Sequence, residues 1–241
     1  MIEVLLLFGI TAFIAGVVLG FTGFGGALVM APVFMTITDP VTATAMILIV
    51  NAVVGVANLR AVGVETDWSI ARPLCIAACA ASPIGLWMLS SVDVDAVRRV
   101  VAGAVIVAST GLALRWRFPF SIRHRAGNAA LGLASGSLFG LGGVGGPPVI
   151  IGMLAEDLPA RTTRATLLTF FAIVQSFTLL LMVLQGVVSP RSALMGLALA
   201  PAYFLGNVIG LRLLTPERAP IFRTVSIITL FAVAGYALLP R

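Results

Sequence analysis

Apolar residues run along this chain in long blocks rather than alternating with polar residues. Most of the eight blocks are close to the roughly 20 residues that a helix needs to cross about 30 Å of hydrocarbon. The polar segments between them are short, which leaves no room for a separate soluble domain. The pattern predicts an all-α, polytopic bundle of transmembrane helices. The blocks are residues 4–20 running on to 37, 41–59, 69–89, 96–114, 129–154, 167–188, 193–211 and 221–239.

Composition supports a membrane protein and argues against a nucleic-acid partner. Of the 241 residues, 60% are apolar and only 10% are charged, whereas a soluble domain carries about 25% charge. The 15 Lys and Arg residues are all Arg, and they lie at block ends and in the loop around residues 115–125. A basic nucleic-acid site needs a folded surface with stacking aromatics, which so short a loop does not supply. Anchoring at the cytoplasmic side of a bilayer explains the cluster better.

Glycines reveal an internal duplication. Shifting the sequence by 120 residues aligns five glycines of the first half with five of the second without a gap, and it gives 12 identities in 44 positions. Self-similarity at a fixed offset indicates a repeat architecture. We therefore predict two repeats, residues 1–120 and 121–241. The aligned glycines are Gly16, Gly20, Gly23, Gly25 and Gly26 with Gly136, Gly140, Gly143, Gly145 and Gly146.

These paired motifs resemble a known family. The first half opens with Gly16-Val-Val-Leu-Gly-Phe-Thr-Gly-Phe-Gly-Gly26, and the second opens with Gly136-Ser-Leu-Phe-Gly-Leu-Gly-Gly-Val-Gly-Gly-Pro-Pro148. Both are similar to the signature of the TauE/SafE, or sulfite-exporter-like, permeases, and the resemblance covers essentially the whole chain. It implies a multi-pass permease of the bacterial inner membrane for sulfite, an organosulfonate or a related anion.

The glycine clusters predict two breaks in helices inside the membrane. Each glycine costs a helix about 1 kcal/mol relative to alanine, and Pro147 and Pro148 lack backbone donors. Non-helical backbone at membrane depth is tolerated only where it is buried in protein or lines a cavity, and broken helices at matching places in two repeats indicate a transport site. Glycine N–H groups beside a helix N-terminus would suit an oxyanion. The predicted substrate-binding glycines are Gly20, Gly23, Gly25, Gly26, Gly140, Gly143, Gly145 and Gly146.

Other glycines fit a different role. The pairs at spacing four, including Gly16 with Gly20 and Gly206 with Gly210, are typical of closely packed helices. We therefore expect a large side chain at Gly16 or Gly136 to loosen packing. By contrast, a large side chain at Gly25 or Gly145 should block the site and leave the fold intact.

Polar residues inside the blocks complete the candidate site. Such residues are costly in a bilayer and face a cavity or a partner helix. Thr22, Asn51, Gln175 and Asn207 are assigned to substrate binding, with hydrogen bonding between helices as the alternative for each. We expect the arginines near block ends, Arg164 among them, to extend their charged groups to the membrane interface rather than to contact the substrate.

The apolar blocks have no acidic residue in their middle and no histidine, which excludes several classes of function. All nine acidic residues lie in loops or near block ends, which disfavours a proton-coupled cation or metal exporter. The single histidine, His124, lies in the basic loop, so no His-based catalytic or metal centre is available. We expect a transporter rather than an enzyme, with no cofactor or metal, a small anion as substrate, and an anion channel as the alternative. The sequence does not define the oligomeric state, and a homodimer is compatible with it.

Arginine counts suggest a topology. If residues 4–37 and 129–157 each enter and leave the membrane on one side, each half crosses an odd number of times and the halves are inverted. Eleven arginines then lie inside and four outside, the asymmetry expected of a real orientation. The hypothesis places both termini outside.

Overall fold

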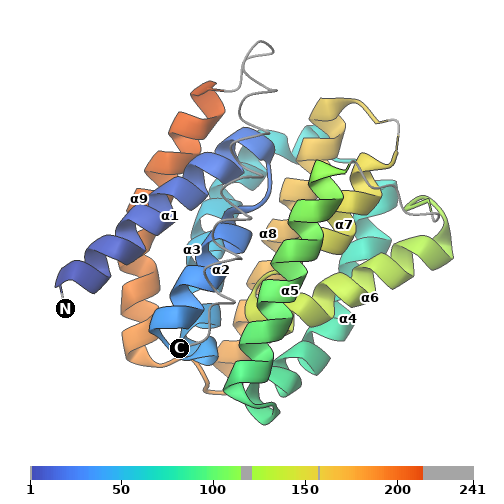
Figure 1. Cartoon of the computed structure of the whole chain (residues 1–241). Helices are drawn as coiled ribbons and strands as arrows, with labels where there is room; N and C mark the ends of the chain where they lie inside the picture. The colour runs from blue at the N-terminus through green and yellow to red at the C-terminus, as the bar shows by residue number, and fades with distance from the viewer. Residues whose placement is uncertain (1, 115–120, 157, 214–241) are drawn as a thin grey trace.

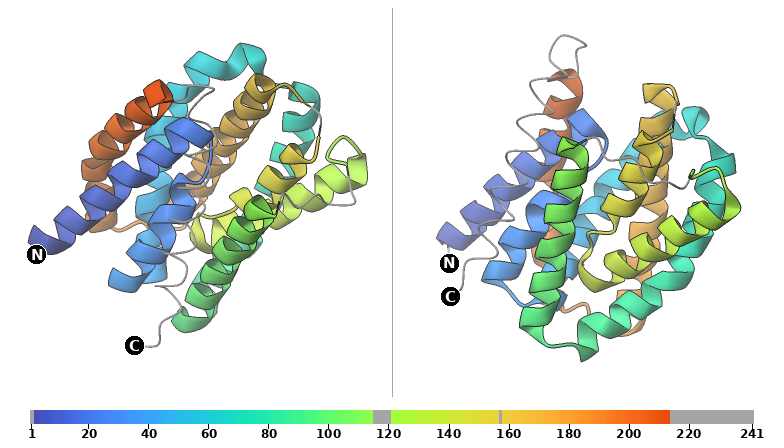
Figure 2. Two further views of the ribbon diagram at one scale, coloured as in Figure 1. Left: turned by 45° about the horizontal axis from the view of Figure 1, so that its top comes forward. Right: turned by 45° about the vertical axis from the view of Figure 1, so that its right-hand side comes forward.

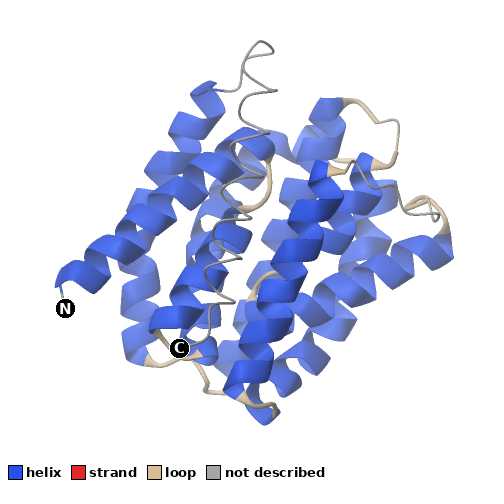
Figure 3. Ribbon diagram, in the orientation of Figure 1, coloured by secondary structure: helices blue, strands red, loops and turns tan. Residues whose placement is uncertain are grey.

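The computed structural model describes residues 2–114, 121–156 and 158–213, and all regular secondary structure in this part of the chain is helical (Figures 1 and 3). The long apolar runs form helices because a helix satisfies every backbone donor and acceptor internally, which a bilayer demands. The elements are α1 (Ile2–Thr22), α2 (Gly26–Ile37), α3 (Pro40–Val62), the 3₁₀ turn η1 (Gly63–Glu65), α4 (Trp68–Ser91), α5 (Val94–Ala113), α6 (Arg125–Gly142), α7 (Gly146–Leu154), α8 (Ala160–Leu184) and α9 (Pro190–Leu213).

Both glycine clusters interrupt a helix, as the sequence predicts. The chain leaves the helical conformation at residues 23–25, between α1 and α2, and again at residues 143–145, between α6 and α7. The two breaks are 120 residues apart, the same offset as the glycine alignment. Gly23, Gly25 and Gly143 have positive φ angles of 80°, 90° and 70°, a conformation that glycine adopts at no steric cost.

Each broken helix folds back on itself. The start of α1 contacts the end of α2, where the rings of Phe8 and Phe34 lie 4.7 Å apart. Likewise the segment before α6 meets the residues after α7, because the Ser121 hydroxyl and the Ile122 amide donate to the Glu156 carboxylate at 2.6 and 3.0 Å. In each unit, therefore, the chain enters and leaves at the same end of the bundle.

Helices from the first half pair with helices from the second half. The closest pairs are α1 with α9 and α4 with α6, which lie at opposite flanks of the bundle (Figures 1 and 2), while α3 packs against α8 and α9. The prediction that Gly16 and Gly136 are packing residues is confirmed. A Cβ atom at Gly16 would overlap the Tyr203 carbonyl of α9, and one at Gly136 would overlap Ala78 of α4.

Five described helices are long and apolar enough to cross a membrane, namely α1, α3, α4, α8 and α9. The chain is thus an integral, multi-pass membrane protein. The first and fifth apolar blocks are each two helices rather than one span, and the eighth block, residues 221–239, lies outside the described residues. The full count of eight spans and the division into repeats 1–120 and 121–241 therefore stay predictions.

Charged contacts mark the two ends of the bundle. At one end Arg123 lies 3.8 Å from both Asp67 and Glu156. Asp67 also caps α4 by accepting from the Ser69 amide at 3.0 Å, and the Ser69 hydroxyl lowers the pKa of its carboxyl. At the other end Arg98 donates to the Met35 carbonyl at 2.8 Å. We call the first the arginine-rich end, because Arg60, Arg72, Arg123, Arg125, Arg161, Arg164 and Arg212 belong to the helix ends gathered there.

Candidate functional site

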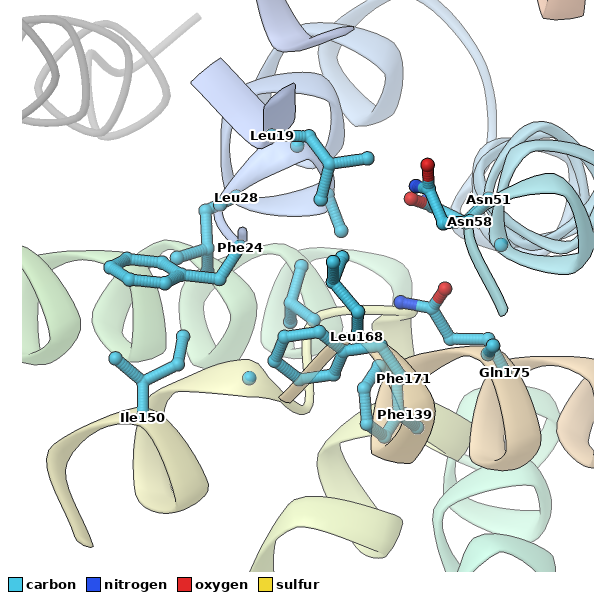
Figure 4. A pocket seen from close by; sticks show the side chains of 17 residues that line it. Leu19, Phe24, Leu28, Asn51, Asn58, Phe139, Ile150, Leu168, Phe171 and Gln175 are labelled. Atoms are coloured by element: carbon cyan, nitrogen blue, oxygen red, sulfur yellow. The ribbon is translucent and has the colours of Figure 1, made fainter. Parts of the chain in front are cut away.

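A small cavity lies at the centre of the bundle, where the two glycine segments meet. The segment between α1 and α2 supplies Gly25, and the segment between α6 and α7 supplies Val144. Helices α3 and α8 contribute much of the rest of the wall, and residues of α1, α2, α6 and α7 complete it (Figure 4). The volume of about 30 Å³ is enough for one or two water molecules, since a single water needs roughly 10–15 Å³. We call this space the central cavity.

The structure brings five of the twelve predicted site residues to this cavity. Gly25, Gly26, Asn51, Gly146 and Gln175 line it, together with Asn58, a further amide of α3. The other seven do not line the central cavity, and they are Gly20, Thr22, Gly23, Gly140, Gly143, Gly145 and Asn207. Their assignment to substrate binding stays a prediction.

Gln175 is the most informative polar group in the wall. Its side chain is 5% exposed, and its amide makes no hydrogen bond with any residue that the structure describes. Figure 4 shows this amide directed into the cavity, on the same side as Asn51 and across from Phe24. An amide that faces a cavity without a protein partner is available to water or to a ligand.

Asn51 is held in place by α9 and by its own helix, α3. The Tyr203 hydroxyl of α9 donates to its Oδ1 at 2.6 Å, and its Nδ2 donates to the Ile47 carbonyl at 2.8 Å. One of the two Nδ2 hydrogens is then left for the cavity. Tyr203 in turn lies against Gly26, where a Cβ would overlap its hydroxyl. Gly26 is therefore required for the contact that orients Asn51.

The two glycine segments offer different numbers of backbone donors. Gly26, Ala27 and Leu28, which line the cavity, form the first turn of α2, and the N–H groups of a first turn have no carbonyl partner within their own helix. In α7 the corresponding turn contains Pro147 and Pro148, which have no N–H. The partly positive wall expected from both segments is therefore concentrated at the N-terminus of α2.

Packing explains why several predicted glycines lie away from the cavity. A Cβ at Gly20 would overlap the Asn207 carbonyl, and one at Gly140 would overlap that of Ser82. Gly145 points at the Ser135 carbonyl and the Phe139 ring, and its own carbonyl accepts from the Ser135 hydroxyl. The expectation that a large side chain at Gly145 leaves the fold intact is therefore wrong.

Thr22 and Asn207 make structural hydrogen bonds. The Thr22 hydroxyl lies 2.5 Å from the Phe24 carbonyl and accepts from the Phe24 amide at 3.2 Å. Asn207 donates to Asn58 at 3.2 Å, and its own oxygen is buried without a partner among the described residues. Thr22 thus braces the first glycine segment, and Asn207 orients an amide of the cavity wall.

A much larger cavity opens at the arginine-rich end. Its volume is about 720 Å³, and the end of α1, the end of α7 and the start of α8 line it. Arg161 and Arg164 of α8 are in its wall. The Arg164 Nη2 donates to the Gly20 carbonyl at 3.0 Å, so this arginine reaches the end of α1 instead of only snorkelling to the interface. We call this space the vestibule.

The sequence did not predict that Tyr203 orients Asn51 or that Phe24 lines the cavity. For Arg164 it predicted snorkelling rather than a hydrogen bond to Gly20. Tyr203 lies 152 residues from Asn51 in the chain, and no local pattern links the two. The one available signal was the position of Phe24, which stands between two glycines of the predicted break.

Two broken helices that meet at a central cavity, inside a bundle of apolar helices, define a membrane protein built for solute passage. The comparison with family models agrees, because residues 8–237 match the family described as sulfite exporter TauE/SafE. The chain belongs to this family of membrane transporters. No curated protein and no solved structure matches the chain.

Proposed function

We propose that the protein transports a small anion of the sulfite or organosulfonate type, which binds in the central cavity. The observation that carries this proposal is the unpartnered amide of Gln175, a residue 5% exposed, directed into a cavity that both glycine segments line. The family match over residues 8–237 supports a sulfite-type substrate.

The groups around the cavity suit an anion rather than a cation. The N-terminus of α2 contributes N–H groups and the positive end of a helix dipole, and Asn51 and Gln175 contribute amide donors. Every described acidic residue lies in a loop or in the first turn of a helix, so none is available to the cavity as a cation ligand. Outward movement of an anion can be driven by the membrane potential, worth about 2.3 kcal/mol per charge per 100 mV.

The two halves are proposed to be inverted repeats in a bacterial inner membrane. The α1–α2 unit enters from the end that holds Arg98, and the α6–α7 unit enters from the arginine-rich end. Seven of the ten described arginines belong to the arginine-rich end, and the other three (Arg98, Arg99 and Arg191) belong to the opposite end. This asymmetry supports a cytoplasmic location for the arginine-rich end.

Flux into proteoliposomes tests the proposal. We expect purified protein to carry radiolabelled sulfite, with competition by sulfonates and with no uptake of divalent metals or organic cations. Empty liposomes are the control. Cation flux without anion flux would overturn the proposal.

Kinetics distinguish a carrier from a channel. The central cavity has a volume of only about 30 Å³, which supports a carrier that must change shape to pass its substrate. We expect saturable flux and counterflow, in which unlabelled sulfite on one side drives labelled sulfite uphill. Linear flux without counterflow would identify a channel.

A further inference from the structure

Phe24 stands between the vestibule and the central cavity. It lines both spaces, and it is the one residue common to the two walls in the part of the chain that the structure describes. The volumes on its two sides differ greatly, about 720 Å³ and about 30 Å³. A solute that moved from the vestibule into the cavity by this route would have to pass its ring.

The backbone around Phe24 is suited to movement. Gly23 and Gly25 flank it with φ angles of 80° and 90°, and glycine moves between positive and negative φ at little steric cost. The Thr22 hydroxyl accepts from the Phe24 amide and lies within hydrogen-bond distance of the Phe24 and Val18 carbonyls, so it is a restraint that must be released before Phe24 can move. The ring itself is half-buried rather than enclosed by the core.

The second glycine segment shares only one of these features, the positive φ of Gly143, at 70°. Val144 occupies the position 120 residues after Phe24, is 1% exposed, and lines the central cavity but not the vestibule. Beside it Gly145 packs against Phe139. A Cβ atom built at Gly143 would lie 3.2 Å from the Ile47 side chain. The two segments thus differ in their central residue, because Phe24 is half-buried and borders two spaces, whereas Val144 is buried in the core.

Arg164 fixes the frame in which Phe24 would move. Its Nη2 bonds the Gly20 carbonyl in the last turn of α1, and its Cγ would lie 2.8 Å from a Cβ at Gly23. The guanidinium therefore holds the end of α1 directly before the hinge. Its positive charge also faces the vestibule, where it would attract an anion.

We propose that Phe24 is the gate through which the transported anion passes between the vestibule and the central cavity, with Gly23 and Gly25 as its hinges. This inference rests on the proposed function for the identity of the solute. The gate itself is a statement about access to the cavity, and it is testable without any transport measurement.

The test measures access to a cysteine inside the central cavity. Leu168 lines the cavity and is 5% exposed, so Leu168→Cys is the reporter, in a background with Cys75→Ala and Cys79→Ala. The probe is 2-sulfonatoethyl methanethiosulfonate, a small anion that modifies thiols. Its reaction rate is followed by mass spectrometry on the purified protein, and the melting temperature of each variant is measured alongside.

We expect Phe24→Ala to raise the labelling rate by about tenfold or more, because removing the ring joins the two spaces. Thr22→Val, which keeps the ring but removes the hydroxyl that holds its backbone, should raise the rate less strongly. Phe21→Ala is the matched control, because Phe21 lines the vestibule and not the cavity, and it should leave the rate unchanged.

Two results would overturn the gate. One is an unchanged rate in both Phe24→Ala and Thr22→Val, and the other is an equal rise in Phe21→Ala, which would indicate general loosening. If Phe24→Ala does not fold, Thr22→Val alone decides the question. A raised labelling rate in a protein that carries no sulfite would support the gate and contradict the proposed substrate. The two proposals can therefore fail independently.

Discussion

At the scale of single residues, the polar side chains around the cavity fall into two groups. Asn51, Asn207 and Thr178 each hydrogen-bond a neighbouring helix. Gln175 does not, although its side chain is as buried as that of Asn51. Residues of the first group hold helices together, whereas Gln175 is available to a ligand, and this difference gives a direct experimental comparison.

We predict opposite effects for two substitutions on α8. Gln175→Leu keeps the volume but removes the free amide, so it should lower sulfite flux by about tenfold or more. The melting temperature should stay constant or rise, because no hydrogen bond between protein groups is lost. Thr178→Val removes the 3.2 Å contact with Ser82 and should lower the melting temperature but not the flux per folded molecule. Both quantities are measured on the same purified samples. Wild-type flux from Gln175→Leu would move the site away from this amide.

The residue scale also shows what a sequence can reveal about a site. Asn51 and Gln175 stood out because amides are rare within apolar blocks, and both line the cavity. Gly20 and Gly140 belong to the same motifs but pack against backbone. Composition and spacing identify glycines that allow close contact or an unusual φ. Whether a given glycine faces the cavity or a neighbouring helix depends on how the helices are arranged.

At the scale of elements, the breaks at residues 23–25 and 143–145 were predictable and the partners of the broken helices were not. Clustered glycines and the pair of prolines oppose a helix locally, whatever surrounds them. The pairing of α1 with α9 depends on contacts between residues at opposite ends of the chain. Gly16 and Gly206 indicated that close packing exists, without indicating which helices share it.

Two glycines of α1 test this pairing. Gly9 has open space around an added Cβ, whereas a Cβ at Gly16 would overlap the Tyr203 carbonyl. Gly9→Ala should therefore stabilise the protein by about 0.5–1 kcal/mol through the lost backbone entropy of glycine. Gly16→Ala should destabilise it by about 1–3 kcal/mol, as expected of overpacking. Thermal unfolding in detergent measures both, and equal effects at the two positions would contradict the α1–α9 contact.

At the scale of the whole molecule, the arginine-rich end gives an orientation that can be checked. His124 is exposed at that end, and Gln185 is exposed at the end of α8 on the other side of the bundle. In the cysteine-free background we expect His124→Cys to react with a membrane-impermeant maleimide only after cells are permeabilised. Gln185→Cys should react in intact cells. The reverse labelling pattern would invert the orientation, and labelling of both positions in intact cells would contradict the single crossing that α8 makes after the α6–α7 unit.

The pairing of α1 with α9 has a consequence for how the protein is made. Helix α1 leaves the ribosome first, but the backbone against which Gly16 and Gly20 pack belongs to α9, which is translated near the end of the described chain. Synthesis at roughly 5–20 residues per second imposes a delay on the order of ten seconds or more. During that interval the small-residue face of α1 is covered only by lipid or by the insertion machinery. A nascent chain released before α9 would carry a first helix whose glycine face lacks its packing partner.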